Sequence, residues 1–256
     1  MLFTIITISR NNREGLARTA QSLQLQEYSD FEWIIIDGNS DDGTDDDFES
    51  YDATIISEDD AGPYDAMNKG LALATGEYVL FLNSGDRLAQ TQTLKKIKEA
   101  VSLSKPDFIY GDAWEFSEGR TWYKPARPHT KVAKGMFTHH QAMLYKNSLV
   151  KEQCYDLSYK IAADYEFTVL FLNKARTCLY LAMPICVFEA GGISQTNVSL
   201  GRKEQFIIRR KTQIVIVPKN VAIYAAQMVS WGLRSCAPRL YWQIKNIRST
   251  DTSQTP

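Results

Sequence analysis

The stretch Glu77-Tyr78-Val79-Leu80-Phe81-Leu82-Asn83-Ser84-Gly85-Asp86 is the part of the sequence that says most about the fold. Tyr78 to Leu82 are five consecutive apolar residues, and they end abruptly on small and polar ones. A short apolar run bounded by turn residues is typical of a strand buried on both faces. In an open α/β sheet, ligands bind beyond the carboxyl ends of such strands. We therefore expect Asn83 and Asp86 at the rim of a cleft, although an ordinary Asx turn would use the same residues.

Strands and helices alternate around this stretch in the order that a parallel sheet with crossover helices requires. The first part of the chain predicts strands at 3–9, 31–36, 53–57 and 77–82, separated by helices at 14–26, 45–51 and 63–75. Further along, helices are predicted at 91–104, 164–174, 202–213 and 219–235, and strands at 108–110, 113–116, 121–123, 177–181 and 186–189. The predicted class is α/β, with a Rossmann-like, mainly parallel central sheet flanked by helices.

Charge divides the chain into an acidic front and a basic end. Residues 1–100 carry 19 acidic and 8 basic side chains, whereas residues 202–248 carry ten basic ones and a single acid, Glu204. We expect one large α/β domain at 1–200, a basic amphipathic helical extension at 201–248, and a disordered tail at 249–256. Aromatic and basic residues interleave in the extension, which suits an anionic membrane surface. A packing helix with a solvated basic face is the alternative.

The sequence also bears on location. The first residues, Met1-Leu2-Phe3, carry no basic segment of a signal peptide, and no run approaches the ~18 apolar residues of a spanning helix. The four cysteines are scattered and lack the spacing of a zinc site or a disulfide framework, so we expect buried thiols in a reducing compartment. The expected location is the cytoplasm, with peripheral attachment to the inner face of the cell membrane.

Three of the predicted strands end in polar residues, at Ser9-Arg10-Asn11, at Asp37-Gly38-Asn39-Ser40 and at Asn83 to Asp86. The carboxyl ends of parallel strands share one edge of the sheet, so these residues should converge on a nucleotide site. Asp37 would accept hydrogen bonds from a base or ribose, unless it only forms the turn before Gly38. Neither a G-x-G-x-x-G motif nor a P-loop is present, which argues against dinucleotide oxidoreductases and P-loop kinases.

The helix expected from Pro63 begins next to this edge, and its N-terminus would face phosphate. Its polar members are Asp65, Asn68 and Lys69, which we include among the predicted nucleotide-binding residues.

Several ordered motifs resemble glycosyltransferase family 2, in the subgroup of colanic-acid and O-antigen transferases. The resemblance spans residues 3 to about 196 and is specific for the family, but not for the sugar. The motifs that carry it are Thr4-Ile-Ile-Thr7, Glu32 to Thr44, Ser57 to Gly70, Ala74-Thr-Gly-Glu-Tyr78, Phe81-Leu-Asn-Ser-Gly-Asp86, His140-Gln141-Ala142, Ala163-Asp164-Tyr165 and Gly191-Gly-Ile-Ser194.

The resemblance implies a GT-A fold and an inverting transfer of sugar from a nucleotide-diphosphate sugar, assisted by Mn²⁺ or Mg²⁺. It implies that Asp37 holds the base or ribose, with Thr7, Ser9 and Asn11 in the same pocket. Asp86 would bind the metal, together with Asn83. Many relatives carry Asp-x-Asp-Asp where this chain has Asn83-Ser-Gly-Asp86, which predicts weaker metal binding.

For the reaction itself, the resemblance places Asp164 as the general base that removes the acceptor's proton. Inversion requires a base on the face of the sugar opposite the leaving group. Without the resemblance, Asp164 would be read as a helix N-cap. His140 is a candidate contact for diphosphate or acceptor, with a purely structural role as the alternative, and Glu166 is a candidate second carboxylate.

The expected function is therefore an inverting glycosyltransferase that uses a UDP- or GDP-sugar. Its acceptor would be lipid-diphosphate-linked or an oligosaccharide, in surface polysaccharide assembly such as exopolysaccharide or O-antigen biosynthesis. Two alternatives remain. A sugar-1-phosphate nucleotidyltransferase would need a glycine- and arginine-rich loop where Arg10-Asn11-Asn12 stands. A non-catalytic nucleotide-sugar-binding protein would fit the missing carboxylates. No nucleic-acid partner is expected.

Overall fold

The structure is a computed structural model, and it describes residues 1–236. The chain forms two compact units, Met1–Thr196 and a second that begins at Asn197, and each is described by itself. The predicted tail at 249–256, and the part of the predicted basic extension from residue 237 on, lie outside the described residues.

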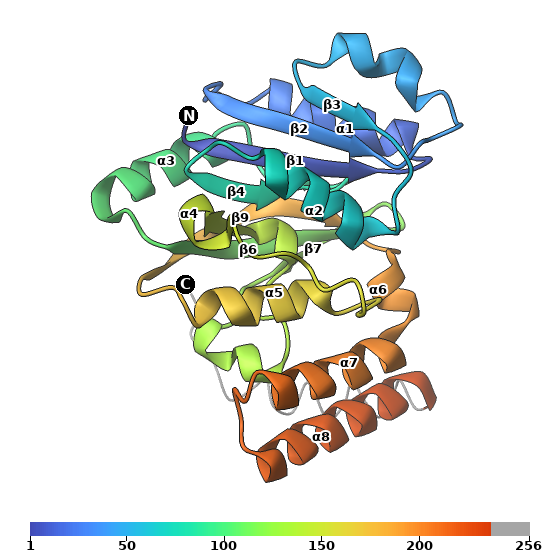
Figure 1. The fold of residues 1–256 in the computed structure, drawn as a ribbon, viewed down its shortest axis with the longest axis vertical. Coiled ribbons are helices and arrows are strands. Elements are labelled where there is room, and N and C mark those ends of the chain that lie inside the picture. Colours follow the sequence, from blue (N-terminus) through green and yellow to red (C-terminus); the bar gives the residue numbers. More distant parts are fainter. Residues whose placement is uncertain (237–256) are drawn as a thin grey trace. The chain divides into compact units, whose positions relative to one another are not determined.

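A nine-stranded sheet organises the first unit (Figure 1). The strand order is β3 (Thr54–Ser57), β2 (Phe31–Asp37), β1 (Phe3–Ser9), β4 (Tyr78–Phe81), β8 (Met143–Lys146), β6 (Phe108–Ser117), β9 (Cys178–Glu189) and β5 (Arg87–Leu88), with β7 (Arg120–Lys124) paired to β6. The first four strands are mutually parallel, as are β6 and β9. The remaining pairings are antiparallel. The predicted α/β class is confirmed.

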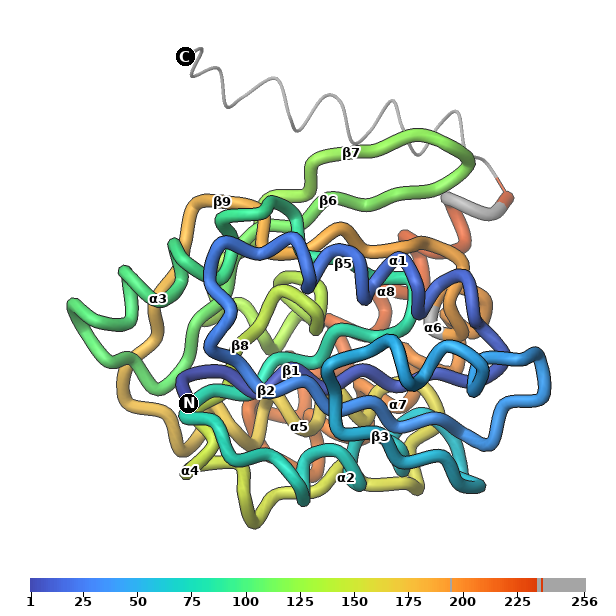
Figure 2. Tube along the Cα trace, turned by 90° about the horizontal axis from the view of Figure 1, so that it is seen from above, coloured from blue at the N-terminus to red at the C-terminus, as the bar shows by residue number. Residues whose placement is uncertain are grey.

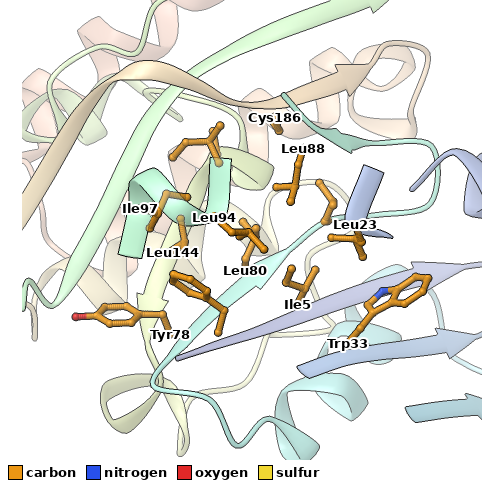
Figure 3. Close-up of a cluster of buried hydrophobic side chains, with 14 of the residues drawn as sticks. Ile5, Leu23, Trp33, Tyr78, Leu80, Leu88, Leu94, Ile97, Leu144 and Cys186 are labelled. Atoms are coloured by element: carbon orange, nitrogen blue, oxygen red, sulfur yellow. The ribbon is translucent and has the colours of Figure 1, made fainter. Parts of the chain in front are cut away.

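Helices cover both faces of this sheet, with α1 (Arg13–Gln24) and α2 (Pro63–Leu73) on opposite sides of β1 and β2 (Figure 2). With α1, α3 (Thr93–Ser104) covers the face that carries Ile5 and Leu80, where a large hydrophobic cluster lies (Figure 3). The other face packs against α2 through Ile34 and Ile36, and against α5 (Ala163–Leu172) through Phe81. Burial of this apolar surface is the main stabilising contribution.

The short elements complete the first unit. They are the 3₁₀ helices η1 (Thr44–Ser50), η2 (His129–Lys134) and η3 (His140–Ala142), and the helices α4 (Asn147–Val150) and α6 (Ile193–Thr196).

Two pairs of predicted strand fragments are single strands in the structure. Residues 108–110 and 113–116 both belong to β6, and 177–181 and 186–189 both belong to β9. The register between β6 and β9 shifts on both sides of Asp112, so a bulge interrupts the alternation without ending the strand. A Cβ at Gly111 would lie 2.8 Å from the carbonyl oxygen of Met183, which shows how closely the two backbones approach there.

The second unit contains two long helices, α7 (Val198–Lys211) and α8 (Val217–Cys236). The rings of Phe206 and Tyr224 pack 5.3 Å apart, and the fully buried Arg209 donates from Nε to Asn220 Oδ1 at 2.6 Å. Within residues 1–236, none of the helices combines the length and apolar character needed to cross a bilayer. The predicted burial of the cysteines is wrong for Cys154 and Cys236, which are exposed.

Candidate functional site

The three polar strand ends lie side by side, as the sequence predicts. Strands β2, β1 and β4 are adjacent and parallel, and Ser9 is in register with Asp37. The β1–β4 ladder continues beyond β4, since the N–H of Ser84 donates to the carbonyl of Ile8 at 3.0 Å. We call this edge of the sheet, residues 9–12, 37–42 and 83–86, the strand-end edge.

Asp37 is the buried acceptor at the centre of the strand-end edge, with only 1% of its surface exposed. Its Oδ2 accepts from the backbone N–H of Ser40 at 2.9 Å and from the hydroxyl of Ser57 at 2.7 Å. Its Oδ1 accepts from the hydroxyl of Ser40 at 2.5 Å. A carboxylate offers about four lone-pair sites, and the protein itself occupies three of them.

The loops that follow β1 and β2 are joined by polar contacts. The N–H of Asn11 donates to Ser40 Oγ at 2.8 Å, and Asn11 Oδ1 accepts from the N–H of Asp41 at 2.9 Å. Asn11 takes a left-handed backbone conformation, φ 48°, which asparagine tolerates better than most residues. Arg13 forms ion pairs with Asp47 at 2.7 Å and Asp46 at 3.1 Å. The two loops therefore present one fixed surface at the edge.

Ser9 and Thr7 have different positions on β1, although both were predicted to line the nucleotide pocket. Ser9 is 6% exposed, and its hydroxyl has no hydrogen-bond partner among the described residues. Buried polar groups are normally paired, so this orphan hydroxyl suits a ligand that supplies the missing partner. Thr7 is completely buried and accepts from the indole N–H of Trp33 at 3.0 Å. Thr7 therefore packs inside the protein beneath the strand-end edge and has no exposed surface for contact with a nucleotide.

The predicted nucleotide ligands on α2 are largely committed to internal contacts. The side chain of Asn68 donates to the carbonyl of Tyr155 at 3.0 Å and accepts from its N–H at 2.7 Å. Lys69 donates to the carbonyl of Asp59 at 2.7 Å and pairs with Glu58 at 2.8 Å. Asp65 accepts from the N–H of Ala61 at 3.0 Å. These contacts fix the start of α2 and the chain before α5.

The turn 83–86 is held against α1 by Thr19. The Thr19 hydroxyl accepts from the N–H of Gly85 at 3.0 Å and donates to the carbonyl of Asp86 at 2.8 Å. Asp86 is 4% exposed, and its Oδ1 accepts from the N–H of Glu189 at 2.9 Å. Burial, together with the charge of Glu189, raises the pKa of Asp86 to about 7. A positive ligand at this turn would favour the ionised carboxylate.

The turn fits a divalent cation that also takes oxygens from a diphosphate. The amide oxygen of Asn83 is buried and lacks a partner among the described residues, and the Asp86 carboxylate is nearby in the same turn. Residues 1–236 contain no group of three or more His, Cys, Asp or Glu side chains placed to hold a metal ion by themselves. Mg²⁺ usually takes one or two carboxylates and completes its shell with phosphate oxygens and water, so such a cluster is not required.

Asp164 lies in the first turn of α5, on the sheet face opposite α1. Its Oδ1 accepts from the N–H of Tyr165 at 2.7 Å, and the N-cap of α5 is Ala162, so the N-cap interpretation of Asp164 is wrong. The rings of Phe81 and Phe167 lie 6.2 Å apart, which places α5 against β4. Asn83 follows Phe81 by two residues and leaves the strand toward the same face. Asn83, at the start of the turn, therefore shares the sheet face of Asp164, whereas Thr19 holds Gly85 and Asp86 against α1.

His140 and Glu166 are buried, with exposures of 6% and 2%. His140 stacks on Phe81 with 5.0 Å between ring centres and is hydrogen-bonded to the Tyr155 hydroxyl at 3.1 Å. Burial lowers the pKa of His140 to about 3, so its ring is neutral near pH 7. Both side chains pack inside the protein, which favours the structural role for His140 and gives no support to a contact of either with the acceptor.

Sequence reasoning missed three contributors to the strand-end edge. Ser57 ends β3 in register with Asp37, so the pairing of neighbouring parallel strands could have indicated it. Thr19 is a polar residue on the apolar face of α1, which is a weak signal. Glu189 reaches the turn from 103 residues away, and no local pattern in the sequence indicates it.

Comparison with known proteins gives a consistent result. A family model described as Glycosyl transferase family 2 matches residues 4–163. The PGL/p-HBAD biosynthesis glycosyltransferase of Mycobacterium tuberculosis (strain ATCC 25618 / H37Rv) is 32% identical over 252 residues, which is 91% of this chain and 98% of the relative.

Two solved structures share the fold. Residues 1–349 of S. aureus TarS in complex with UDP-GlcNAc superpose with a TM-score of 0.71 at 18% identity, over 92% of this chain and 74% of that one. The mannosyltransferase PcManGT from Pyrobaculum calidifontis, in complex with GDP-Man and Mn²⁺, gives a TM-score of 0.61 at 14% identity, over 98% and 81%. The chain has the GT-A fold and belongs to glycosyltransferase family 2.

Proposed function

We propose that the protein transfers a sugar from a nucleoside-diphosphate sugar to an acceptor hydroxyl, with inversion at the anomeric carbon. The observation that carries this proposal is the strand-end edge, where Asp37, the orphan hydroxyl of Ser9 and the turn 83–86 converge. The similar structures hold UDP-GlcNAc and GDP-Man, which supports a donor of this chemical class.

Each part of the edge would bind a different part of the donor. Asp37 would accept a hydrogen bond from a donor group of the base or ribose, and Ser9 has a hydroxyl that lacks a partner. Asn83 and Asp86 would hold Mn²⁺ or Mg²⁺ together with the diphosphate. When bound, such a cation stabilises the negative charge that accumulates on the departing nucleoside diphosphate.

Asp164 is the proposed general base. Its carboxylate is half-buried at the start of α5, and one of its oxygens is oriented by the N–H of Tyr165. The carboxylate would accept the proton of the acceptor hydroxyl as that oxygen attacks the anomeric carbon and the bond to the diphosphate breaks. The first turn of α5 is held in place by an aromatic cluster beneath it, made of Phe81, His140, Tyr155 and Phe167.

We also propose that the acceptor is a lipid-diphosphate-linked or oligosaccharide intermediate in surface polysaccharide assembly, at the cytoplasmic face of the membrane. The resemblance to colanic-acid and O-antigen transferases supports this acceptor class. In the second unit, α8 exposes Val217, Val221, Val229 and Trp231, and α7 ends on the exposed Arg210 and Lys211. Exposed apolar and basic residues on helices favour contact with an anionic bilayer. Absence of the full chain from floated anionic liposomes would count against membrane attachment.

The experiment measures nucleoside diphosphate release from UDP-GlcNAc and GDP-mannose, with Mn²⁺ and a lipid-diphosphate-linked sugar as acceptor, by wild type, Asp164→Asn and the exposed control Glu152→Gln. Loss of a general base lowers the rate by roughly 10²- to 10⁴-fold. Asp164→Asn should therefore lose release while it retains donor binding, whereas Glu152→Gln should match wild type. Donor binding without release by wild type would instead favour a non-catalytic binding protein, which the absence of acids at positions 83 and 85 would explain.

A further inference from the structure

Glu189, the last residue of β9, brings a second carboxylate to the turn 83–86. Its backbone N–H donates to Asp86 Oδ1 at 2.9 Å, so residues 86 and 189 are fixed next to each other. The Glu189 side chain is 38% exposed, in contrast to the buried Asp86, and so remains accessible to a ligand from solvent.

The Glu189 carboxylate lies where a side chain at position 85 would be. Gly85 has a φ of +99°, a conformation that favours glycine, and a Cβ built on it would lie 3.0 Å from Glu189 Oε2. Because Thr19 bonds both to the N–H of Gly85 and to the carbonyl of Asp86, the turn is fixed beneath this carboxylate. Gly85 therefore leaves space for the carboxylate of Glu189, which belongs to another strand, β9.

Arg18 on α1 orients the Glu189 carboxylate. One guanidinium nitrogen contacts Oε1 at 3.1 Å and Oε2 at 2.8 Å. Both side chains are more than a third exposed, so the ion pair adds little to stability. Its geometric effect is larger, since a contact with both oxygens fixes the direction of the carboxylate.

We propose that Glu189 is a ligand of the divalent cation that binds with the donor's diphosphate, together with Asp86 and the amide oxygen of Asn83. This inference rests on the proposed function. Two unpartnered buried atoms, Asn83 Oδ1 and the hydroxyl of Ser9, point to a ligand at this edge. Two carboxylates and one amide oxygen form a hard-oxygen donor set, which suits Mg²⁺ or Mn²⁺ completed by phosphate oxygens.

The test is a titration of the full chain with Mn²⁺ at saturating UDP, and separately GDP, in which electron paramagnetic resonance reports free Mn²⁺. Glu189→Gln should bind Mn²⁺ about 10- to 100-fold more weakly than wild type. Loss of a residue that only supports a metal ligand already has an effect of this size, and loss of a ligand should have at least the same effect. Glu14→Gln is the matched control, because Glu14 is the other acid beside Arg18, at 4.0 Å. It should bind Mn²⁺ as wild type does.

Arg18→Gln separates a ligand from a purely structural ion pair. It removes the same ion pair but keeps the Glu189 carboxylate, so its Mn²⁺ affinity should stay within about fivefold of wild type. Equal losses in Arg18→Gln and Glu189→Gln, or no loss in Glu189→Gln, would overturn the inference. If Glu189→Gln does not fold, Glu189→Asp offers a second approach. It keeps the charge but withdraws the carboxylate by one methylene group, and it should also weaken Mn²⁺ binding.

A wild-type chain that binds no Mn²⁺ with either nucleotide would also end this inference. That result would leave the proposed function standing if nucleoside diphosphate were still released from the donor without added cation. The two failures are therefore distinguishable.

Discussion

Asp37→Ala should destabilise the first unit measurably, because the carboxylate is a structural acceptor as well as a proposed nucleotide ligand. The substitution removes three hydrogen bonds, two from Ser40 and one from Ser57. Bonds to a charged acceptor contribute about 1.5–3 kcal/mol each. Water can reach the exposed Ser57 and the half-buried Ser40. We therefore expect a net loss of about 2–4 kcal/mol in the free energy of unfolding, well below the sum of the three bonds.

Urea unfolding followed by circular dichroism measures this loss. Asp37→Asn is the matched variant: its amide oxygen can still accept from the N–H of Ser40, so it should lose less than about 1.5 kcal/mol. Both variants should bind nucleotide more weakly, since Asp37→Asn replaces one acceptor oxygen by a donor. An unfolding free energy for Asp37→Ala within about 0.5 kcal/mol of wild type, the range of ordinary surface substitutions, would refute this account of the edge.

Three further predictions concern stability and charge. The pKa of His140 is about 3 in the folded chain, below its usual 6.5, so the unfolded chain takes up the proton first as the pH falls. Protonation of His140 in the unfolded chain should lower the free energy of unfolding by about 2 kcal/mol between pH 6.5 and pH 5. Urea titrations at the two pH values should find this loss reduced in His140→Gln. Gly76→Ala should lower the free energy of unfolding by about 1–3 kcal/mol, measured by urea unfolding, because its Cβ would lie 2.6 Å from the backbone of Phe3. Asn83→Asp should bind Mn²⁺ roughly tenfold more tightly by titration, since it adds a carboxylate beside Asp86, while the metal-free chain should melt at a lower temperature.

Most of the parallel half of the fold could be predicted from the sequence because its signals are local. The apolar run that stops before Asn83 predicted β4, and β-branched runs of the same kind predicted β1 and β2. Proline at residue 63 marked the start of α2. Parallel neighbours then require their polar ends to share one edge, which brings Ser9 and Asp37 together without any knowledge of side-chain contacts.

The environment of several site residues could not be predicted, because it depends on contacts between residues far apart in the sequence. Thr7 lies on the same face of β1 as Ser9, two residues back, and only the position of Trp33 shows that it is covered. Asn68 has the polarity of a ligand, but its amide is used by the backbone of Tyr155, 87 residues away. Glu189 reached its place beside Asp86 through the pairing of β9 with β5 and β6, a long-range arrangement with no local sequence signal.

The most direct test of the central claim is a thermal-shift panel of UDP, GDP, CDP, dTDP and ADP, with and without Mn²⁺, on wild type and Asp37→Asn. A ligand of the native state adds about 2.7 kcal/mol of apparent stability at a hundredfold excess over its Kd. One nucleotide should stand out, more strongly with Mn²⁺, and its effect should shrink in Asp37→Asn. A flat panel with wild type, or an equal shift in both proteins, would contradict a nucleotide site at the strand-end edge.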